Sequence, residues 1–157
     1  MSPTPEGEVL SAPNIIEYPF TRTTGPVIGA FMTGLREGVV LGIKGSDGRV
    51  LCPPPEYDAD TAEPLTELVE LADEGEVLTW AWIREPIADQ PLDRPFAFAL
   101  VRLDGADTGL LHAVDAGSPD AMSTGMRVKV RWRTEREGSI TDIECFEPVG
   151  SGTGGAA

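Results

Sequence analysis

Cysteine and histidine are nearly absent from this sequence. Its 157 residues contain two cysteines, Cys52 and Cys145, and one histidine, His112. A structural zinc site needs four Cys or His ligands, so these three residues cannot complete one, and we expect neither a metal nor another cofactor. The chain also lacks the basic start and apolar run of a signal peptide, which favours reduced thiols in the cytoplasm over an exported disulfide.

Basic residues are few, and long apolar runs are missing. Twelve Lys and Arg residues stand against 26 Asp and Glu residues, and the formal net charge is -14. Such a charge repels nucleic acid and anionic membrane surfaces. Gly, Pro or a charged residue interrupts every apolar segment before it reaches the roughly 20 residues that span a bilayer. We therefore expect a soluble protein that has neither nucleic acid nor a membrane as its partner.

The two ends of the chain differ in composition from the rest. Residues 1–14 are polar and contain proline, and residues 150–157 contain only Gly, Ser, Thr and Ala. Segments of this kind cannot bury enough apolar surface to become ordered. We expect both ends to be disordered.

Residues 15–64 are predicted to form a helix and a small hairpin. The apolar spacing that follows Gly25-Pro26 predicts a short helix ending at Gly38. After it, the β-prone runs 39–43 and 49–51 flank an Asp-Gly pair, which is typical of a tight hairpin turn. The proline-rich stretch 52–60 then excludes a helix interior or a central strand.

Five β-prone runs separated by turn residues lie within residues 65–149. The predicted strands are 65–83 with a bend at Glu74-Gly75, 96–103, 109–114, 126–133 and 140–146. Ser118-Pro119 predicts a single helical turn between the third and fourth strands. This order is typical of the OB-fold, a five-stranded Greek-key barrel, although a sandwich or an SH3-like barrel has the same strand count. The predicted fold is mainly β, with an OB-fold barrel after the helix and hairpin.

Basic residues alternate with apolar residues along the fourth predicted strand. These basic residues, here called the basic stripe, are Arg127, Lys129, Arg131 and Arg133. Four like charges on one face need counter-charges, and cross-strand carboxylates such as Asp142 and Glu144 are the simplest source. The phosphates of a CoA ester or an acidic patch on a partner protein are the functional alternatives.

Several local patterns occur in an order that resembles a known protein family. The patterns are Phe31 with Leu35-Arg36-Glu37-Gly38, Asp47-Gly48-Arg49-Val50-Leu51 before Pro53-Pro54, residues 75–82, residues 96–104 and Gly125-Met126-Arg127-Val128-Lys129-Val130. Together they resemble the zinc-ribbon and OB-fold proteins of acyl-CoA metabolism, known as domain of unknown function thirty-five. That family's ribbon usually holds zinc between two Cys-x-x-Cys knuckles. Here Cys52 is followed by Pro55 at the matching position, which implies a degenerate, metal-free ribbon.

The resemblance implies a non-catalytic accessory subunit. Its partner would be a thiolase-like lipid-transfer protein or aldolase that acts on CoA thioesters in steroid or lipid catabolism, with two copies of each chain. The catalytic residues and the bound CoA thioester would belong to that partner. From expected exposed aromatic residues and from the resemblance, the predicted contact residues are Tyr18, Phe20, Phe31, Tyr57, Trp82 and Arg84.

Individual residues offer little catalytic chemistry of their own. No nucleophile and orienting acid accompany His112, so a structural or interface role is favoured. Cys52 lacks a cationic neighbour that would activate its thiol. The acidic residues between Glu56 and Glu70 lack the glycine and terminal glutamate of a calcium loop, which favours a solvated or partner-facing surface.

Two other functions stay open at this point. Trp80 and Trp82 share one strand face and could stack on bases in an OB-fold single-stranded nucleic-acid-binding protein. A stand-alone acyl-CoA-binding protein or hydrolase is the other alternative. The loop 84–95 is long for a connection between neighbouring strands, so it is a candidate binding element in any of these functions.

Overall fold

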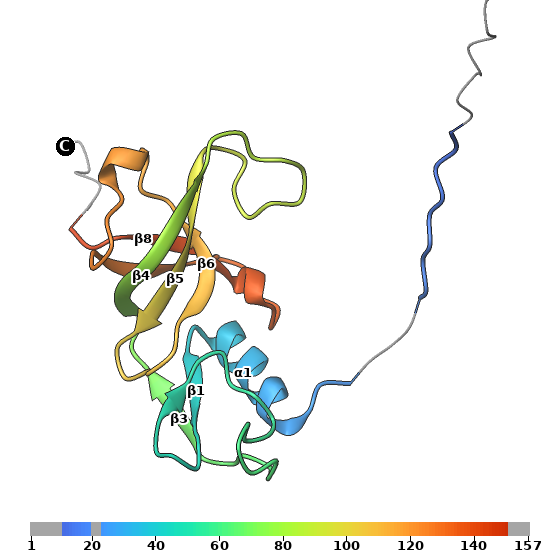
Figure 1. The fold of residues 1–157 in the computed structure, drawn as a ribbon, viewed down its shortest axis with the longest axis vertical. Coiled ribbons are helices and arrows are strands. Elements are labelled where there is room, and N and C mark those ends of the chain that lie inside the picture. Colours follow the sequence, from blue (N-terminus) through green and yellow to red (C-terminus); the bar gives the residue numbers. More distant parts are fainter. Residues whose placement is uncertain (1–10, 20–22, 151–157) are drawn as a thin grey trace, which may run out of the picture.

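A computed structural model of the chain describes residues 11–19 and 23–150. Residues 11–19 are exposed and form no helix or strand. The expected disorder at residues 1–10 and 151–157 lies outside the described residues, as does Phe20. The folded part has two regions, with the β-barrel in the upper half of Figure 1 and the helix with a small sheet in the lower half.

The predicted helix is present as α1 (Pro26–Glu37). Gly25 precedes it and offers no capping side chain, so the first turn is capped from a distant part of the chain. The Glu56 carboxylate accepts hydrogen bonds from the backbone N–H groups of Val27 at 3.2 Å and Ile28 at 2.8 Å. Gly38 ends the helix in the left-handed conformation, which a glycine adopts without a Cβ clash. In the described residues, no helix is long and apolar enough to cross a membrane.

The predicted hairpin is part of a three-stranded antiparallel sheet. Strand β1 (Val40–Lys44) lies between β2 (Val50–Leu51) and β3 (Leu68–Leu71). Gly48 has a positive φ in the β1–β2 turn, as the Asp-Gly pair predicted. The third strand was not anticipated, because β3 was expected to continue into the barrel.

Five strands close into a barrel in the order β4-β5-β6-β8-β7. Their bounds are β4 (Glu74–Ile83), β5 (Phe96–Leu103), β6 (Leu110–Val114), β7 (Arg127–Trp132) and β8 (Ile143–Pro148). All neighbouring pairs are antiparallel except β6 and β8, which are parallel and share one register pair, Val114 with Phe146. One turn of 3-10 helix, η1 (Pro119–Ala121), lies between β6 and β7. This arrangement confirms the predicted OB-fold.

Three details of the predicted strands are wrong. Residues 65–83 form two strands in different sheets, because the chain leaves the small sheet after Leu71 and enters the barrel at Glu74. The register shift in β4 falls between Val77 and Thr79 instead of at Glu74-Gly75. The start of the last predicted strand is a 3-10 turn, η2 (Ile140–Asp142), whose N-cap Ser139 and Asp142 cap each other's backbone N–H groups.

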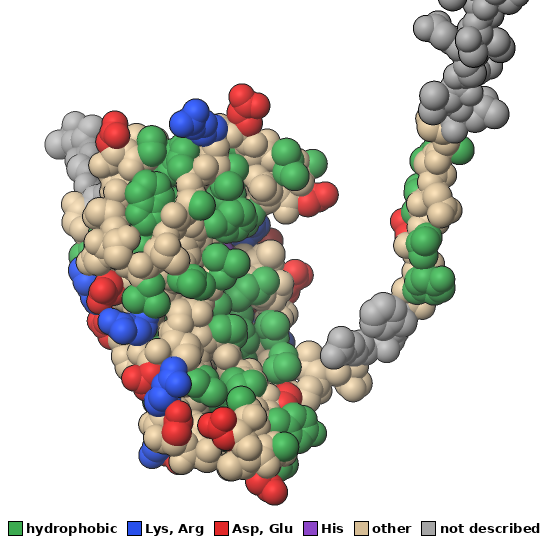
Figure 2. All heavy atoms as spheres, in the orientation of Figure 1, with side chains coloured by type: hydrophobic (Ala, Val, Ile, Leu, Met, Phe, Trp, Pro, Cys, Tyr) green, Lys and Arg blue, Asp and Glu red, His purple; other side chains and the backbone are tan. Residues whose placement is uncertain are grey.

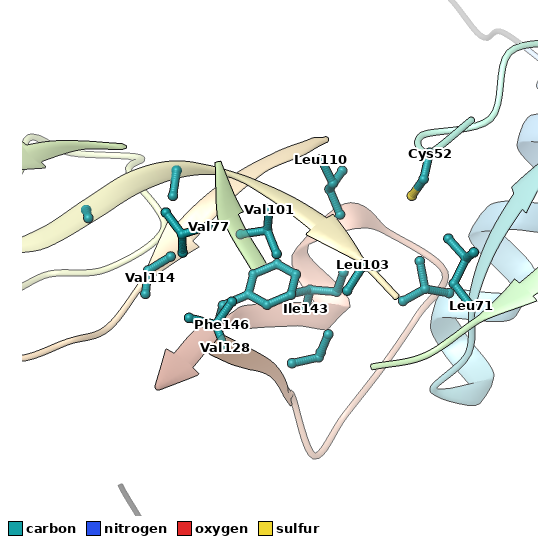
Figure 3. Packing of buried hydrophobic residues seen from close by; sticks show 14 of the residues in the cluster. Cys52, Leu71, Val77, Val101, Leu103, Leu110, Val114, Val128, Ile143 and Phe146 are labelled. Atoms are coloured by element: carbon teal, nitrogen blue, oxygen red, sulfur yellow. The ribbon is translucent and has the colours of Figure 1, made fainter. Parts of the chain in front are cut away.

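One hydrophobic core joins the barrel to the helix and small sheet. Leu35 of α1 and Leu71 of β3 belong to the same buried cluster as Val101, Leu103 and Phe146 of the barrel. Figure 3 shows Leu71 close to Leu103 at the junction between the two regions. The helix and the small sheet therefore pack on the barrel as part of one folded unit.

Candidate partner and ligand surfaces

Most of the basic stripe is neutralised within the chain. Arg127 forms a bidentate ion pair with Asp104, in which Nη1 lies 2.8 Å from Oδ1. Lys129 Nζ lies 3.5 Å from Glu147 Oε1. Glu147 lies on β8, which pairs with β7, and Asp104 directly follows β5, the strand on the other side of β4. Cross-strand pairing of the expected kind is thus present, but with partners that the sequence analysis did not identify.

Arg131 is the centre of the paired part of the stripe. Its guanidinium nitrogens lie 2.7 Å from Glu144, 3.0 Å from Asp115 and 3.3 Å from Glu147. The pKa of Arg131 is raised because these carboxylates outweigh its partial burial. Asp115 also accepts a hydrogen bond from Arg94, which attaches the loop 84–95 to the end of β6. Asp142, the other expected partner, instead accepts backbone N–H groups of residues 137–139.

Arg133 differs from the other members of the stripe. It lies just beyond β7, its side chain is exposed, and no described residue forms an ion pair with it. A contact with a phosphate or an acidic partner stays a prediction for the stripe. Among its members, Arg133 has the guanidinium that remains available for such a contact.

The aromatic residues do not form an open stacking platform. In the β4–β5 register Trp80 and Trp82 lie opposite Ala99 and Ala97, whose side chains point into the barrel. Both tryptophans are partly buried against the main core. Phe96 is fully buried and meets Phe98 edge to face, with ring centroids 4.8 Å apart. These positions give no support to base stacking on the sheet.

The predicted contact residues occupy different environments. Tyr18 and Tyr57 are 79% and 62% exposed, and Arg84 is exposed at the end of β4. Phe31 is the exception, because it is only 4% exposed and packs into the core from α1. Its predicted place in an exposed contact surface is therefore wrong. Trp82 is partly buried, and Phe20 lies outside the described residues.

The acidic stretch after the proline-rich connector has a local structural role at two positions. Glu56 caps α1 through its carboxylate. Asp58 is buried and its carboxylate accepts hydrogen bonds from the backbone N–H groups of Ser46, Asp60 and Thr61. The bond from Ser46 is the largest of the influences that lower the pKa of Asp58 far below its ordinary value. The described residues contain no group of three acidic, His or Cys side chains that could hold a metal ion.

The cysteines and the histidine are buried and unreactive in this setting. Burial raises the pKa of both Cys52 and Cys145 to about 12, so both thiols are protonated at neutral pH. Burial lowers the pKa of His112, which keeps the imidazole neutral. The Nδ1 atom of His112 is buried and has no hydrogen-bond partner within the described part of the chain.

A hollow of about 300 Å³ lies beneath the loop 84–95. Its walls come from that loop, from β5 and β6, and from the segment 133–144 between β7 and β8. The hollow is visible at the edge of the molecule below the loop in Figure 2. The lining residues come from three parts of the chain that are distant in the sequence, and their meeting could not be predicted from it. The sequence analysis therefore identified only the loop as a candidate binding element.

These features define a class of protein: a small OB-fold barrel that carries an N-terminal helix and sheet. Comparison with known families agrees with this class. The sequence model for the ChsH2 C-terminal OB-fold domain matches residues 68–133, from β3 to just beyond β7. The barrel of this chain is therefore similar to the OB-fold domains of this family model and of DUF35 proteins. No curated protein sequence matches it.

Two solved structures share the fold. A DUF35-family protein of unknown function from Sulfolobus solfataricus is 26% identical, with a TM-score of 0.55 over 68% of this chain and 76% of that chain. A chain of the Ltp2-ChsH2(DUF35) aldolase is 19% identical, with a TM-score of 0.59 over 82% of this chain and 98% of that chain. At 19% identity, the similarity to the aldolase chain shows a shared fold and nothing further.

Proposed function

We propose that this chain is an accessory subunit of a thiolase-like aldolase or thiolase that acts on CoA thioesters in steroid or lipid catabolism. The observation that carries the proposal is a run of exposed apolar side chains before the folded body. Ile15, Ile16 and Tyr18 are 76%, 68% and 79% exposed. Large apolar side chains gathered on one segment are typical of a surface that becomes buried against another protein.

The comparisons support the class of partner. The chain aligns with nearly all of one chain of the Ltp2-ChsH2(DUF35) aldolase, a complex whose name joins a DUF35 protein to a second component. In the proposed assembly, two copies of this chain bind two copies of the thiolase-like subunit. The nucleophile, the base and the CoA thioester site belong to the partner. This chain stabilises the partner and helps to shape its substrate entrance.

Tyr57 and Arg84 extend the proposed contact surface beyond the N-terminal segment. Tyr57 lies in the connector between β2 and β3 and Arg84 at the start of the loop 84–95, and both are exposed. Exposed Tyr and Arg side chains are common at the centres of protein interfaces, because they combine large contact area with hydrogen bonding. Trp82 and Phe20 complete the proposed set.

Co-expression with the thiolase-like protein encoded beside this chain tests the proposal. We expect the two proteins to co-elute in size-exclusion chromatography, and cleavage of a panel of CoA thioesters to require both. Separate elution together with full activity of the neighbour alone would contradict the accessory role.

A double substitution tests the N-terminal segment within that assembly. Ile16→Ser with Tyr18→Ser removes two apolar anchors, and we expect it to weaken the complex by about tenfold or more. Val149→Ser is the matched control, because Val149 is also exposed, at 44%, but follows the last strand. Equal affinities of the double variant and the control, measured by calorimetry, would remove this segment from the interface.

A further inference from the structure

The hollow beneath the loop 84–95 has an apolar floor that the protein itself leaves uncovered. Phe98 of β5 and Leu111 of β6 line it, and Ile143 of β8 is buried behind it. Leu111 is 61% exposed although it lies within the barrel strand β6, whose other residues are buried. Ile140, in the adjoining η2 turn, is 37% exposed at the same hollow. A bound ligand with an apolar part of matching size would remove this surface from water, and such burial is favourable.

The polar groups at the hollow favour a ligand that carries an anionic group at one end of its apolar body. Arg133 lines the hollow and has no ion-pair partner among the described residues. Gln90 lines it from the loop, and its Oε1 accepts a hydrogen bond from Ile87 N at 3.2 Å, so its amide N–H₂ group is left to donate. A guanidinium and an amide donor together match the two oxygens of a carboxylate.

Two acidic residues also line the hollow, and neither cancels this preference. Glu144 is engaged by Arg131 through a 2.7 Å hydrogen bond to its Oε2. Asp89 is exposed on the loop, where solvent screens its charge. Arg133 is therefore the one Lys or Arg side chain of the lining, and neither it nor Asp89 forms an ion pair among the described residues.

His112 adds an independent sign that the hollow is incomplete. Its side chain is more than nine-tenths buried in the wall, and its Nδ1 has no hydrogen-bond partner in the described residues. A buried polar atom without a partner is uncommon in folded proteins and is often explained by a bound group.

We propose that this hollow is a binding site for a small, mainly apolar carboxylate, whose charged end pairs with Arg133 and whose apolar body lies on Leu111, Phe98 and Ile140. Its volume of about 300 Å³ is at the lower end of the range for ligand pockets, roughly 300–1,000 Å³. The ligand is accordingly a short-chain or single-ring acid. This site is independent of the proposed accessory role.

Octanoate, with 1-octanol as its uncharged counterpart, is the probe for this site. We expect saturable shifts of the backbone amide NMR signals of Leu111, His112 and Arg133 when octanoate is added to the isolated full chain, with a dissociation constant at or below about 1 mM. Arg133→Gln should weaken octanoate binding about tenfold and change octanol binding little. Leu111→Ser should weaken both, and its exposed position makes unfolding an improbable cause.

Arg102→Gln is the matched control, because Arg102 is an exposed arginine of β5 that pairs with Glu76 away from the hollow. This variant should bind octanoate as the unmodified chain does. Three results would overturn the proposal: no saturable shifts, shifts scattered over the barrel, or equal octanoate affinity of Arg133→Gln and Arg102→Gln. If octanoate does not bind but the thiolase-like protein shifts the same signals, the hollow is part of the contact surface with that protein. In that case this inference fails and the proposed accessory role stands.

Discussion

Gly75 lies at a close approach between backbone segments of the barrel. It pairs with Leu103 on β5 and with Val128 on β7, so strands flank it on both sides. A Cβ atom built on Gly75 would clash with the carbonyl oxygen of Arg102 and would lie 2.8 Å from Leu103 Cα. Both obstacles are backbone atoms and cannot rotate away.

Gly75→Ala is therefore expected to lower the free energy of unfolding by about 1–3 kcal/mol, the usual cost of overpacking. Chemical denaturation measures this change. Gly29→Ala is the control, because Gly29 lies in α1 and its added Cβ would meet only the exposed Thr24 hydroxyl, at 3.1 Å. Alanine favours a helix by up to about 1 kcal/mol over glycine, so the control should be neutral or stabilising. A Gly75→Ala protein as stable as the unmodified chain would refute the close approach.

Asp58 gives the molecule a pH-dependent component of stability. Its pKa in the folded state lies below the ordinary value of about 3.9, because backbone N–H groups, first that of Ser46, bind the ionised carboxylate. A lowered pKa stabilises the fold at pH values above the unfolded pKa, and this contribution disappears as the pH falls through the folded pKa.

We expect Asp58→Asn to be less stable than the unmodified chain at pH 7, and the difference to shrink progressively below about pH 4. Urea denaturation across this pH range measures it. Asp120→Asn, at an exposed carboxylate in η1, is the control and should show no such convergence. A difference that stays constant down to pH 2 would mean that ionisation of Asp58 does not stabilise the fold.

At the scale of elements, α1 depends on a residue that is distant in the sequence. Glu56 supplies the cap that Gly25 cannot supply, and it does so across 28 or 29 residues. The carboxylate also places negative charge at the helix N-terminus, where the peptide dipoles favour it. The connector is thereby attached to the helix, and both are attached to the barrel through the core.

Glu56→Ala should destabilise the protein by about 1 kcal/mol, as loss of an N-cap usually does. It should also accelerate amide hydrogen exchange at Val27 and Ile28. Glu63→Ala removes an exposed carboxylate from the same connector and is the control. If exchange at the two helix amides is the same in both variants, the cap contributes nothing measurable in solution.

At the scale of the whole molecule, the barrel and the N-terminal region are joined by hydrogen bonds as well as by the shared core. The loop between β5 and β6 makes most of these bonds. Asp107 accepts from Val50 N at 2.8 Å, and the Thr108 hydroxyl bonds to both N and O of Cys52, at 2.8 and 2.9 Å. These contacts give the small sheet a fixed place on the barrel.

We therefore expect a single cooperative unfolding transition. All three tryptophans, Trp80, Trp82 and Trp132, lie in the barrel, whereas α1 lies in the N-terminal region. Thermal unfolding followed by tryptophan fluorescence and by the helical circular dichroism signal should give coincident midpoints. Earlier loss of the helical signal would show that the N-terminal region unfolds separately.

Local patterns in the sequence were sufficient for the elements whose cause is local. Gly25-Pro26 and Gly38 bound a helix, Asp47-Gly48 makes a hairpin turn, and the runs 96–103 and 127–132 form barrel strands, because each depends on neighbouring residues. The OB-fold followed from the order of these strands. Composition alone likewise showed that the chain's three Cys and His residues cannot supply a zinc site of four Cys and His ligands.

Tertiary structure decided which elements pair and which side chains meet. Three features depend on contacts between residues far apart in the chain: the pairing of β3 with the small sheet, the helix cap from Glu56 and the burial of Phe31. The basic stripe shows the same division, since its alternation and one counter-ion, Glu144, were predicted from the sequence, but its other counter-ions were not. Glu147 lies on β8 beside β7, whereas Asp104 and Asp115 directly follow β5 and β6, whose ends the closed barrel brings near the stripe. The same closure leaves Arg133 without an ion pair among the described residues at the hollow, since that residue lies beyond the last strand pair that could supply a carboxylate.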